Sequence, residues 1–163
     1  MTEIIIAHTE SEFKIIAQLA DATWREHYIP IIGVDQVNYM VDKFQTAPAI
    51  ANQINQGYEY FIINYDKTPV GYISIRKEED SLFISKIYIL STYRGKQIGK
   101  AAMTFITDKA KAYEFNSITL TVNKNNTNAI LFYEKMGFIN IDSLIIDIGN
   151  GYVMDDYKMG KSI

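Results

Sequence analysis

Residues 94–100, with the sequence RGKQIGK, place three basic side chains and two glycines between a strand-like and a helix-like segment. Residues 87–90 are rich in β-branched side chains, and apolar residues from 98 onward recur at the spacing of one helical face. The first amides of a helix lack intrahelical partners and carry a partial positive charge, so this turn suits a phosphate or pyrophosphate. The candidate anion-binding residues are Arg94, Gly95, Lys96, Gln97, Ile98, Gly99 and Lys100.

The glycine spacing alone does not identify the anion. It lacks the Gly-x-x-x-x-Gly-Lys-Ser/Thr order of a Walker A loop, and only one of the three Rossmann glycines has the required spacing. The structural alternative is an ordinary basic turn, in which Lys96 and Lys100 are the solvated start of a helix. A nucleotide-binding domain also stays open at this point.

A second informative stretch, residues 120–138, places Asn126 at a turn from strand to helix and Tyr133 seven residues later. On one helix these two residues share a face and lie about 10 Å apart, at 1.5 Å of rise per residue. Such a face suits an extended ligand. The alternatives are that Asn126 is only a helix N-cap and that Tyr133 only packs in the core.

Composition limits the class of protein. With 163 residues and 48% hydrophobic content, we expect one domain, residues 1–163, with a sizeable core. The net charge of −3 argues against a nucleic-acid binder. The absence of cysteine excludes disulfides, a thiolate metal site and a covalent acyl-cysteine, so we expect no metal and a direct group transfer. The N-terminus resembles no signal peptide and no apolar run approaches membrane length, so the sequence predicts a soluble, cytoplasmic protein.

Several elements must position these residues. A capping-box match at Thr9–Glu12 starts the first helix, which a proline and a glycine interrupt around residues 30–33. Turn signals at 66–69 and 78–80 separate three strands of an antiparallel meander, and Gly149-Asn150-Gly151 predicts a terminal hairpin. The expected strands are 3–7, 58–65, 70–77, 82–90, 117–122, 138–148 and 152–159, and the further helices are 34–44, 48–56, one after residue 97 and 127–136.

Together, the two informative stretches resemble the GNAT superfamily of N-acetyltransferases. Residues 94–99 resemble its Arg/Gln-x-x-Gly-x-Gly/Ala acyl-CoA motif, and residues 126–138 resemble its Asn-x-x-Ala…Tyr-Glu-Lys-x-Gly-Phe motif. The likeness is close over residues 70–139. Gln97 departs from the motif, which usually has glycine there, and its Cβ narrows close approach and disfavours a positive φ.

The resemblance implies an α/β (α+β) fold with a mixed, mostly antiparallel sheet of about seven strands, flanked by helices and splayed at the fourth strand. It implies acetyl-CoA as cosubstrate in that gap. The pantetheine arm would pair with the backbone of Ile87 and Ile89 like an added strand. Asn126 would contact the arm, and Tyr133 would lie near the sulfur and give the leaving thiol a proton.

The implied reaction is attack of a neutral amine on the thioester. An alkylamine of pKa about 10.4 is mostly protonated at pH 7, a cost of roughly 4.6 kcal/mol, so a base is useful. Glu26 and His27 are candidates for that base, although both also suit the surface of a helix. The glutamate that the family often has on a strand falls on Phe83 here.

The acceptor follows from a further resemblance. Trp24 to Tyr28 and residues 152–159 resemble the spermidine/spermine acetyltransferases, and aromatic faces and carboxylates suit a polycation. We therefore expect a polyamine such as spermidine or spermine to bind at Trp24, Tyr28, Asp155 and Asp156. Acetylation of a peptide, an amino acid or an antibiotic amine, a non-catalytic acyl-CoA-binding regulatory module, and assembly as a homodimer are alternatives that the sequence leaves open.

Overall fold

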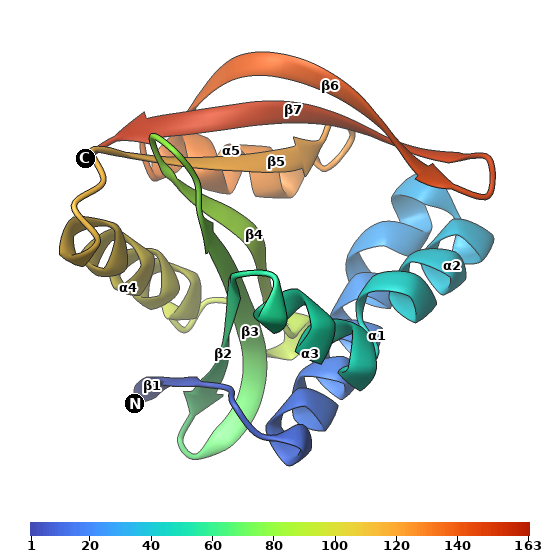
Figure 1. Ribbon diagram of the computed structural model, residues 1–163, viewed down its shortest axis with the longest axis horizontal. Helices are drawn as coiled ribbons and strands as arrows, with labels where there is room; N and C mark the ends of the chain where they lie inside the picture. Colours follow the sequence, from blue (N-terminus) through green and yellow to red (C-terminus); the bar gives the residue numbers. More distant parts are fainter.

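One mixed sheet of seven strands, in the order β1-β2-β3-β4-β5-β7-β6, runs through the protein in a computed structural model that describes residues 1–163 (Figure 1). The sheet class and strand number expected from the sequence are confirmed. The strands are β1 (Thr2–Ile6), β2 (Tyr58–Tyr65), β3 (Thr68–Lys77), β4 (Leu82–Ile89), β5 (Ser117–Asn123), β6 (Ile139–Gly149) and β7 (Tyr152–Ser162). The α-helices are α1 (Glu10–Ile32), α2 (Val34–Phe44), α3 (Ala47–Asn55), α4 (Ile98–Ala112) and α5 (Thr127–Lys135).

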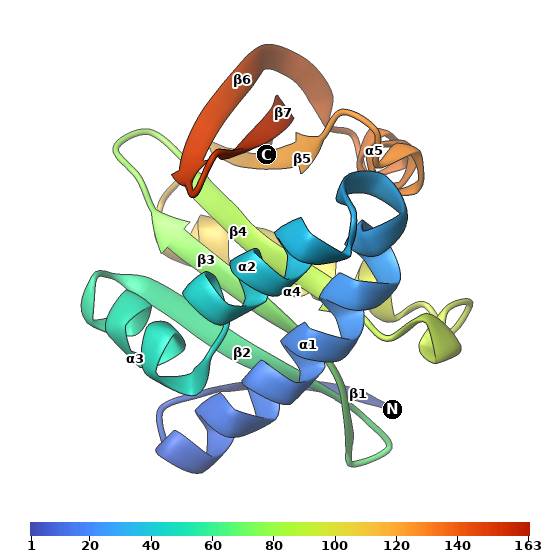
Figure 2. The same ribbon diagram turned by 90° about the vertical axis from the view of Figure 1, so that its right-hand side faces the viewer.

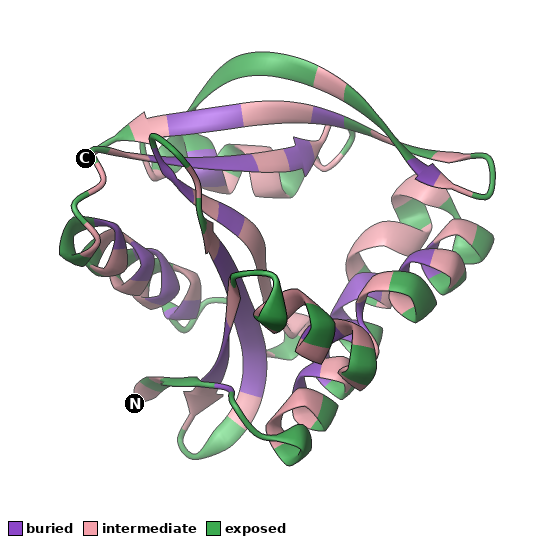
Figure 3. Ribbon diagram, viewed as in Figure 1, coloured by how far each residue is buried: buried purple, intermediate pink, exposed green.

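The helices cover the two faces of the sheet separately. Helices α1, α2 and α3 lie on one face and α4 lies on the other, as two perpendicular views agree (Figures 1 and 2). Each face has its own apolar core, of 12 buried residues with α1 to α3 and of 18 buried residues with α4 and α5. The purple segments of β3 and β4 in Figure 3 lie between these cores. None of the helices combines the length and hydropathy needed to cross a membrane.

Local sequence signals account for most element ends. Thr9 and Glu12 form the expected capping box, and Gly33, at φ 86°, ends α1 and starts α2. Pro30 differs from expectation because it lies inside α1, where its fixed φ suits the helix and only one backbone donor is lost. Pro69 also differs, since it belongs to β3 at a bulge, and the turn before it consists of Asp66 and Lys67.

The sheet splays at β4, as expected. β4 and β5 are parallel and pair through three residue pairs, from Leu82↔Ile118 to Ile84↔Leu120. Beyond Ile84 the two strands diverge, while β4 continues to pair with β3 as far as Ile89. The second half of β4 therefore has a free edge, which lies in the middle of the sheet.

The β6–β7 hairpin is anchored to α2. Its turn residue Asn150 has a positive φ of 54° between two glycines that also have positive φ, as the sequence motif predicts. The Tyr39 hydroxyl donates to the Ile148 carbonyl at 2.7 Å, and the Gln36 amide donates to the Val153 carbonyl at 3.0 Å. These bonds hold the hairpin across the α1–α2 side of the gap (Figure 1).

Candidate active site

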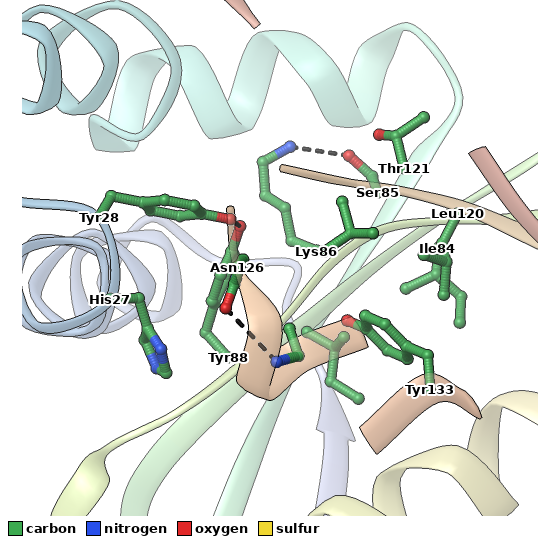
Figure 4. A pocket seen from close by; sticks show the side chains of 13 residues that line it. His27, Tyr28, Ile84, Ser85, Lys86, Tyr88, Leu120, Thr121, Asn126 and Tyr133 are labelled. Atoms are coloured by element: carbon green, nitrogen blue, oxygen red, sulfur yellow. Dashed lines mark hydrogen bonds between the residues drawn. The ribbon is translucent and has the colours of Figure 1, made fainter. Parts of the chain in front are cut away.

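A cavity of about 70 Å³ opens where β4 and β5 separate. Its walls come from α1, β4, β5 and α5, so four elements converge on the gap (Figure 4). The residues that line it are His27, Tyr28, Ile84, Ser85, Lys86, Ile87, Tyr88, Leu120, Thr121, Val122, Asn126, Ala129 and Tyr133. Two sequence candidates from distant parts of the chain, Tyr28 and Tyr133, thus meet here.

The free edge of β4 presents backbone groups to this gap. The Leu90 amide donates to the Val70 carbonyl on β3 at 2.8 Å. Bonded residues alternate along an antiparallel strand, so Tyr88 also directs its backbone to β3, whereas Ile87 and Ile89 direct theirs to the opposite edge. No strand occupies that edge because β5 has diverged, so an extended ligand can pair with both isoleucines.

The start of α4 carries unused amides. The first backbone bond of the helix runs from the Ala101 amide to the Gln97 carbonyl, at 3.1 Å, and Gln97 makes no side-chain cap. The amides of residues 98–100 precede that bond and are therefore free for an anion. Arg94 and Lys96 are exposed beside them, while the Ile98 side chain is buried in the core, so Ile98 offers only its backbone.

Gln97 adopts the conformation that a glycine would adopt. Its φ is 65° and its ψ is 16°, in the left-handed region that costs a residue with a Cβ about 1–2 kcal/mol. The backbone at Gln97 is therefore one that a glycine would also allow. What the substitution adds is a Cβ and a side chain beside the free amides.

We expect Gln97→Gly to tighten CoA binding a few-fold, because it removes the Cβ that restricts approach to the amides. The free energy of unfolding should change by less than about 1 kcal/mol, since relief of the left-handed strain is offset by the greater freedom of the unfolded chain. Calorimetry with CoA and denaturant titration measure the two effects. Gln97→Ala, which keeps the Cβ, is the control; weaker CoA binding by Gln97→Gly would instead show that the glutamine side chain contacts CoA.

Gly99 lies where α4 approaches α5. A Cβ at this position would meet the ring of Phe132 at 3.2 Å, and the Ile89 side chain lies 3.8 Å away. The missing side chain thus allows close packing of the two helices beside the gap, in addition to any ligand contact. Lys100, the next residue, is exposed at the same helix end.

Tyr133 reaches the cavity from α5 and is only 9% exposed. Its hydroxyl makes no hydrogen bond within the protein and lies toward the cavity in Figure 4. Burial raises the pKa of Tyr133 far above its ordinary value, and the hydroxyl stays protonated at every physiological pH. The side chain both packs in the core and offers a free donor to the gap.

Asn126 also combines both of its expected roles. It is the N-cap of α5, where its side-chain oxygen accepts from the Ala129 amide at 3.4 Å. It also lines the cavity, so its amide nitrogen is available to a ligand.

A second cavity of about 50 Å³ adjoins the first on the α1–α2 side. It is lined by 12 residues, five of which also line the first cavity, and it includes Met154 and Asp156 of β7. Asp156 is 1% exposed, and its Oδ1 has no hydrogen-bond partner. Burial, and then the neighbouring Asp155, raise the pKa of Asp156 to about 6, while Lys124 opposes the shift.

Two other acceptor candidates lie outside both cavities. Trp24 is 4% exposed and donates through Nε1 to the Tyr72 hydroxyl at 2.8 Å, so it packs behind Tyr28. Asp155 is exposed and pairs with Lys124 at 2.9 Å, because successive residues of β7 face opposite sides of the sheet. Of the four residues expected to bind the acceptor, only Tyr28 and Asp156 line the same cavity.

The candidate bases Glu26 and His27 have different environments. The Glu26 carboxylate accepts from the Ser91 amide and hydroxyl, at 3.1 and 3.0 Å, and so ties α1 to the segment just before the candidate anion-binding residues 94–100. His27 lines the first cavity, and its buried Nε2 has no partner. Burial and the nearby Arg94 lower the pKa of His27, so the imidazole is neutral at pH 7.

Lys86 lines the first cavity, although no sequence motif singles it out. Its ammonium donates to the Ser85 hydroxyl at 2.8 Å and lies over the rings of Tyr58 and Tyr60. Burial, and then the guanidinium of Arg76, lower the pKa of Lys86 to about 7. The available signal was a single charged residue in the otherwise uncharged run 82–90.

Known proteins with similar sequences include an uncharacterized N-acetyltransferase of Escherichia coli, YjgM. It is 29% identical over 90 residues, which cover 53% of this chain and 54% of that protein. The chain thus matches about half the length of this curated relative.

Solved structures share the whole fold. The PaiA N-acetyltransferase of Thermoplasma acidophilum, in complex with coenzyme A, has a TM-score of 0.84 at 20% identity and covers 100% of this chain and 99% of its own. The ribosomal-protein-S18-alanine N-acetyltransferase of Escherichia coli has a TM-score of 0.74 at 16% identity, covering 100% and 94%. The model of the Acetyltransferase (GNAT) family matches residues 16–138, three quarters of the chain. The protein therefore belongs to the acetyltransferase (GNAT) family.

Proposed function

We propose that residues 1–163 form a single-domain N-acetyltransferase that moves an acetyl group from acetyl-CoA directly to a primary amine. The observation that carries this proposal is the gap between β4 and β5, which joins a free strand edge, an unbonded tyrosine hydroxyl and a buried carboxylate. Family membership and the coenzyme A complex of the PaiA structure support the choice of cosubstrate. The alternative, a non-catalytic acyl-CoA-binding module, shares the loop but needs no acceptor cavity.

The residues present suit the pyrophosphate and the pantetheine arm of acetyl-CoA. The amides of residues 98–100, with Arg94, Lys96 and Lys100 nearby, would hold the pyrophosphate. The backbone of Ile87 and Ile89 would pair with the amides of the pantetheine arm, and Asn126 would contact that arm from α5. Bound in this way, the cosubstrate presents an activated acyl thioester to an amine that enters from the second cavity.

Tyr133 would stabilise the leaving sulfur by donating a hydrogen bond. A thiol has a pKa of about 8.5 by analogy with cysteine, well below the raised pKa of this tyrosine. Complete proton transfer from Tyr133 to the thiolate is therefore uphill, and the hydroxyl contributes chiefly as a fixed donor at the developing charge. Tyr133 would thus act as a hydrogen-bond donor to the sulfur rather than transfer its proton completely.

Spermidine and spermine are the acceptors that we propose first. Asp156 would pair with a terminal ammonium and Tyr28 would offer an aromatic face. Exposed carboxylates on the same hairpin, Asp142 and Asp147, suit the remaining charges. At alkaline pH Lys86 is largely neutral and so does not repel a cation in the adjoining cavity.

Thiol release from acetyl-CoA, measured across polyamines, amino acids, aminoglycosides and peptides, tests both the acetyltransferase activity and the choice of acceptor. We expect turnover with spermidine and a KM for spermidine that rises with added salt, because exposed charge pairs are screened over about 8–10 Å. The double change Lys96→Gln and Lys100→Gln should raise the KM for acetyl-CoA and leave that for spermidine unchanged.

Three outcomes would contradict parts of this function. Thiol release with another amine, but not with spermidine or spermine, would refute only the assignment of a polyamine as the acceptor. CoA binding without release for any amine would favour the non-catalytic module. Tighter binding of ATP than of CoA in calorimetry would favour a nucleotide-binding domain.

A further inference from the structure

Asp156 is a buried carboxylate that the family motifs do not include. It lies on β7 opposite Asn123 of β5, beyond the last paired residue of the β4–β5 ladder. Its Oδ1 has no partner although the residue is 1% exposed. An unpaired buried carboxylate oxygen is costly, so its retention at a cavity wall points to a ligand that completes it.

The surroundings of Asp156 define what that ligand can be. Seven of the 12 residues that line the second cavity are apolar or aromatic, among them Met40, Met154, Tyr28 and Tyr88. The two tyrosine hydroxyls bond each other at 2.7 Å, and neither is a hydrogen-bond partner of the Asp156 Oδ1. No arginine or lysine lines this cavity. A primary ammonium or amine beside an apolar body matches this lining.

The two cavities share part of their wall. Tyr28, Ser85, Tyr88, Thr121 and Val122 line both, so an amine held at Asp156 faces the gap that contains the Tyr133 hydroxyl. The carboxylate thus lines one of two adjoining cavities and the tyrosine lines the other. This arrangement separates a proton acceptor from a hydrogen-bond donor.

We propose that Asp156 binds the acceptor amine and takes the proton that its nitrogen loses during acetyl transfer. This inference rests on the proposed acetyltransferase function and assigns its missing base. The bound ammonium first loses a proton to solvent, and the neutral amine nitrogen bonds to the thioester carbonyl carbon. An N–H proton then passes to the Asp156 carboxylate, and the C–S bond breaks with its electron pair on sulfur. Asp156 then returns the proton to solvent, so the products are the amide and the CoA thiol or thiolate.

Several titratable groups face Asp156 or its cavity. Asp155 and Lys124 adjoin it, Tyr28 and Tyr88 line the same wall, and Lys158 follows two residues later on the same side of β7. Burial and Asp155 favour the protonated acid, and Lys124 and Thr121 favour the carboxylate. The resulting pKa of about 6 leaves Asp156 mostly ionised at pH 7 and near the value that suits a general base.

The test is the pH profile of kcat/KM for the most active amine of the panel. In the wild type, we expect activity to rise through a limb near pH 6, since the base works only when deprotonated. Asp156→Asn should lower kcat/KM about 100-fold and remove that limb, while the KM for acetyl-CoA stays within about three-fold. Asp156→Glu should recover part of the rate with a limb still present.

Two neighbours supply sharper controls. Asp155→Asn removes a repelling charge and should move the limb to lower pH, whereas Lys124→Ala should move it to higher pH. Asp108→Asn, which changes an exposed carboxylate on α4, should leave the profile unchanged. If Asp156 had only a structural role, Asp155→Asn and Lys124→Ala would not shift the limb of the pH profile in opposite directions.

The outcomes separate this inference from the function beneath it. An active wild type whose limb and rate survive Asp156→Asn would overturn the inference alone, and the limb would then belong to His27 or Lys86, which line the adjoining cavity. A wild type that binds CoA but acetylates no amine would overturn the proposed function and the inference together. CoA affinity and circular dichroism of Asp156→Asn show that the variant is folded.

Discussion

Tyr133→Phe should lower kcat by about 100-fold or more and leave CoA affinity nearly unchanged. The hydroxyl is the only part removed, it has no partner within the protein, and it lies at the cavity in the β4–β5 gap. Loss of one fixed donor to a developing negative charge typically costs 10²–10³ in rate. The ring keeps its packing against Phe132 and Phe138, so the fold should persist.

Tyr113→Phe is the matched control for this change. Its hydroxyl donates to Glu59 at 2.7 Å, at the end of α4 remote from the gap, so its removal should cost about 1 kcal/mol of stability and little rate. Stopped-flow thiol release and calorimetry with CoA separate turnover from binding. If Tyr133 only packs, the two variants should have similar turnover, and the assignment of the hydroxyl to the leaving sulfur would be wrong.

Gly99→Glu should abolish measurable CoA binding. The new carboxylate would lie at the uncapped start of α4, among the amides expected to hold the pyrophosphate, and would repel it. The added Cβ also meets the Phe132 ring at 3.2 Å, so part of any effect is steric. We expect the fold to be retained, because an aromatic side chain can shift by a few tenths of an ångström.

Gly99→Gln separates charge from size, because it has the same shape as the glutamate and the same contact with Phe132. It should weaken CoA binding much less than Gly99→Glu does, and added salt should narrow the difference. Equal losses in the two variants would assign Gly99 to helix packing alone. Unchanged CoA affinity in a folded Gly99→Glu protein would remove the loop from the cofactor site.

Much of the fold could be predicted because its signals are local. The capping box at Thr9, the helix start at Ile98 and the glycines around Asn150 each act through their immediate neighbours, and the structure confirms all three. The two prolines differ from expectation for the converse reason. Pro30 is tolerated by α1, and Pro69 by a bulge in β3, through surroundings that the sequence does not reveal.

The acceptor side was harder to predict because it depends on strand register. Asp155 and Asp156 are adjacent, so only one can face the gap, and the choice follows from how β7 pairs with β5. Trp24 and Tyr28 lie one helical turn apart and contact each other, yet only Tyr28 reaches a cavity. Residue types suggested the chemistry in both cases, while tertiary pairing decided which side chain can perform it.

Because the sheet is splayed, the free energy of unfolding should depend on how much acyl-CoA is bound in the gap. β4 pairs with β5 only through Leu82, Phe83 and Ile84. The two halves of the sheet are therefore joined by a ladder of three residue pairs. A ligand that binds only the folded chain stabilises it by about 2.7 kcal/mol at 100 times its Kd. An acyl-CoA arm lying in this gap would act as the absent strand, and the resistance of the protein to heat and proteolysis would then follow the cellular CoA pool.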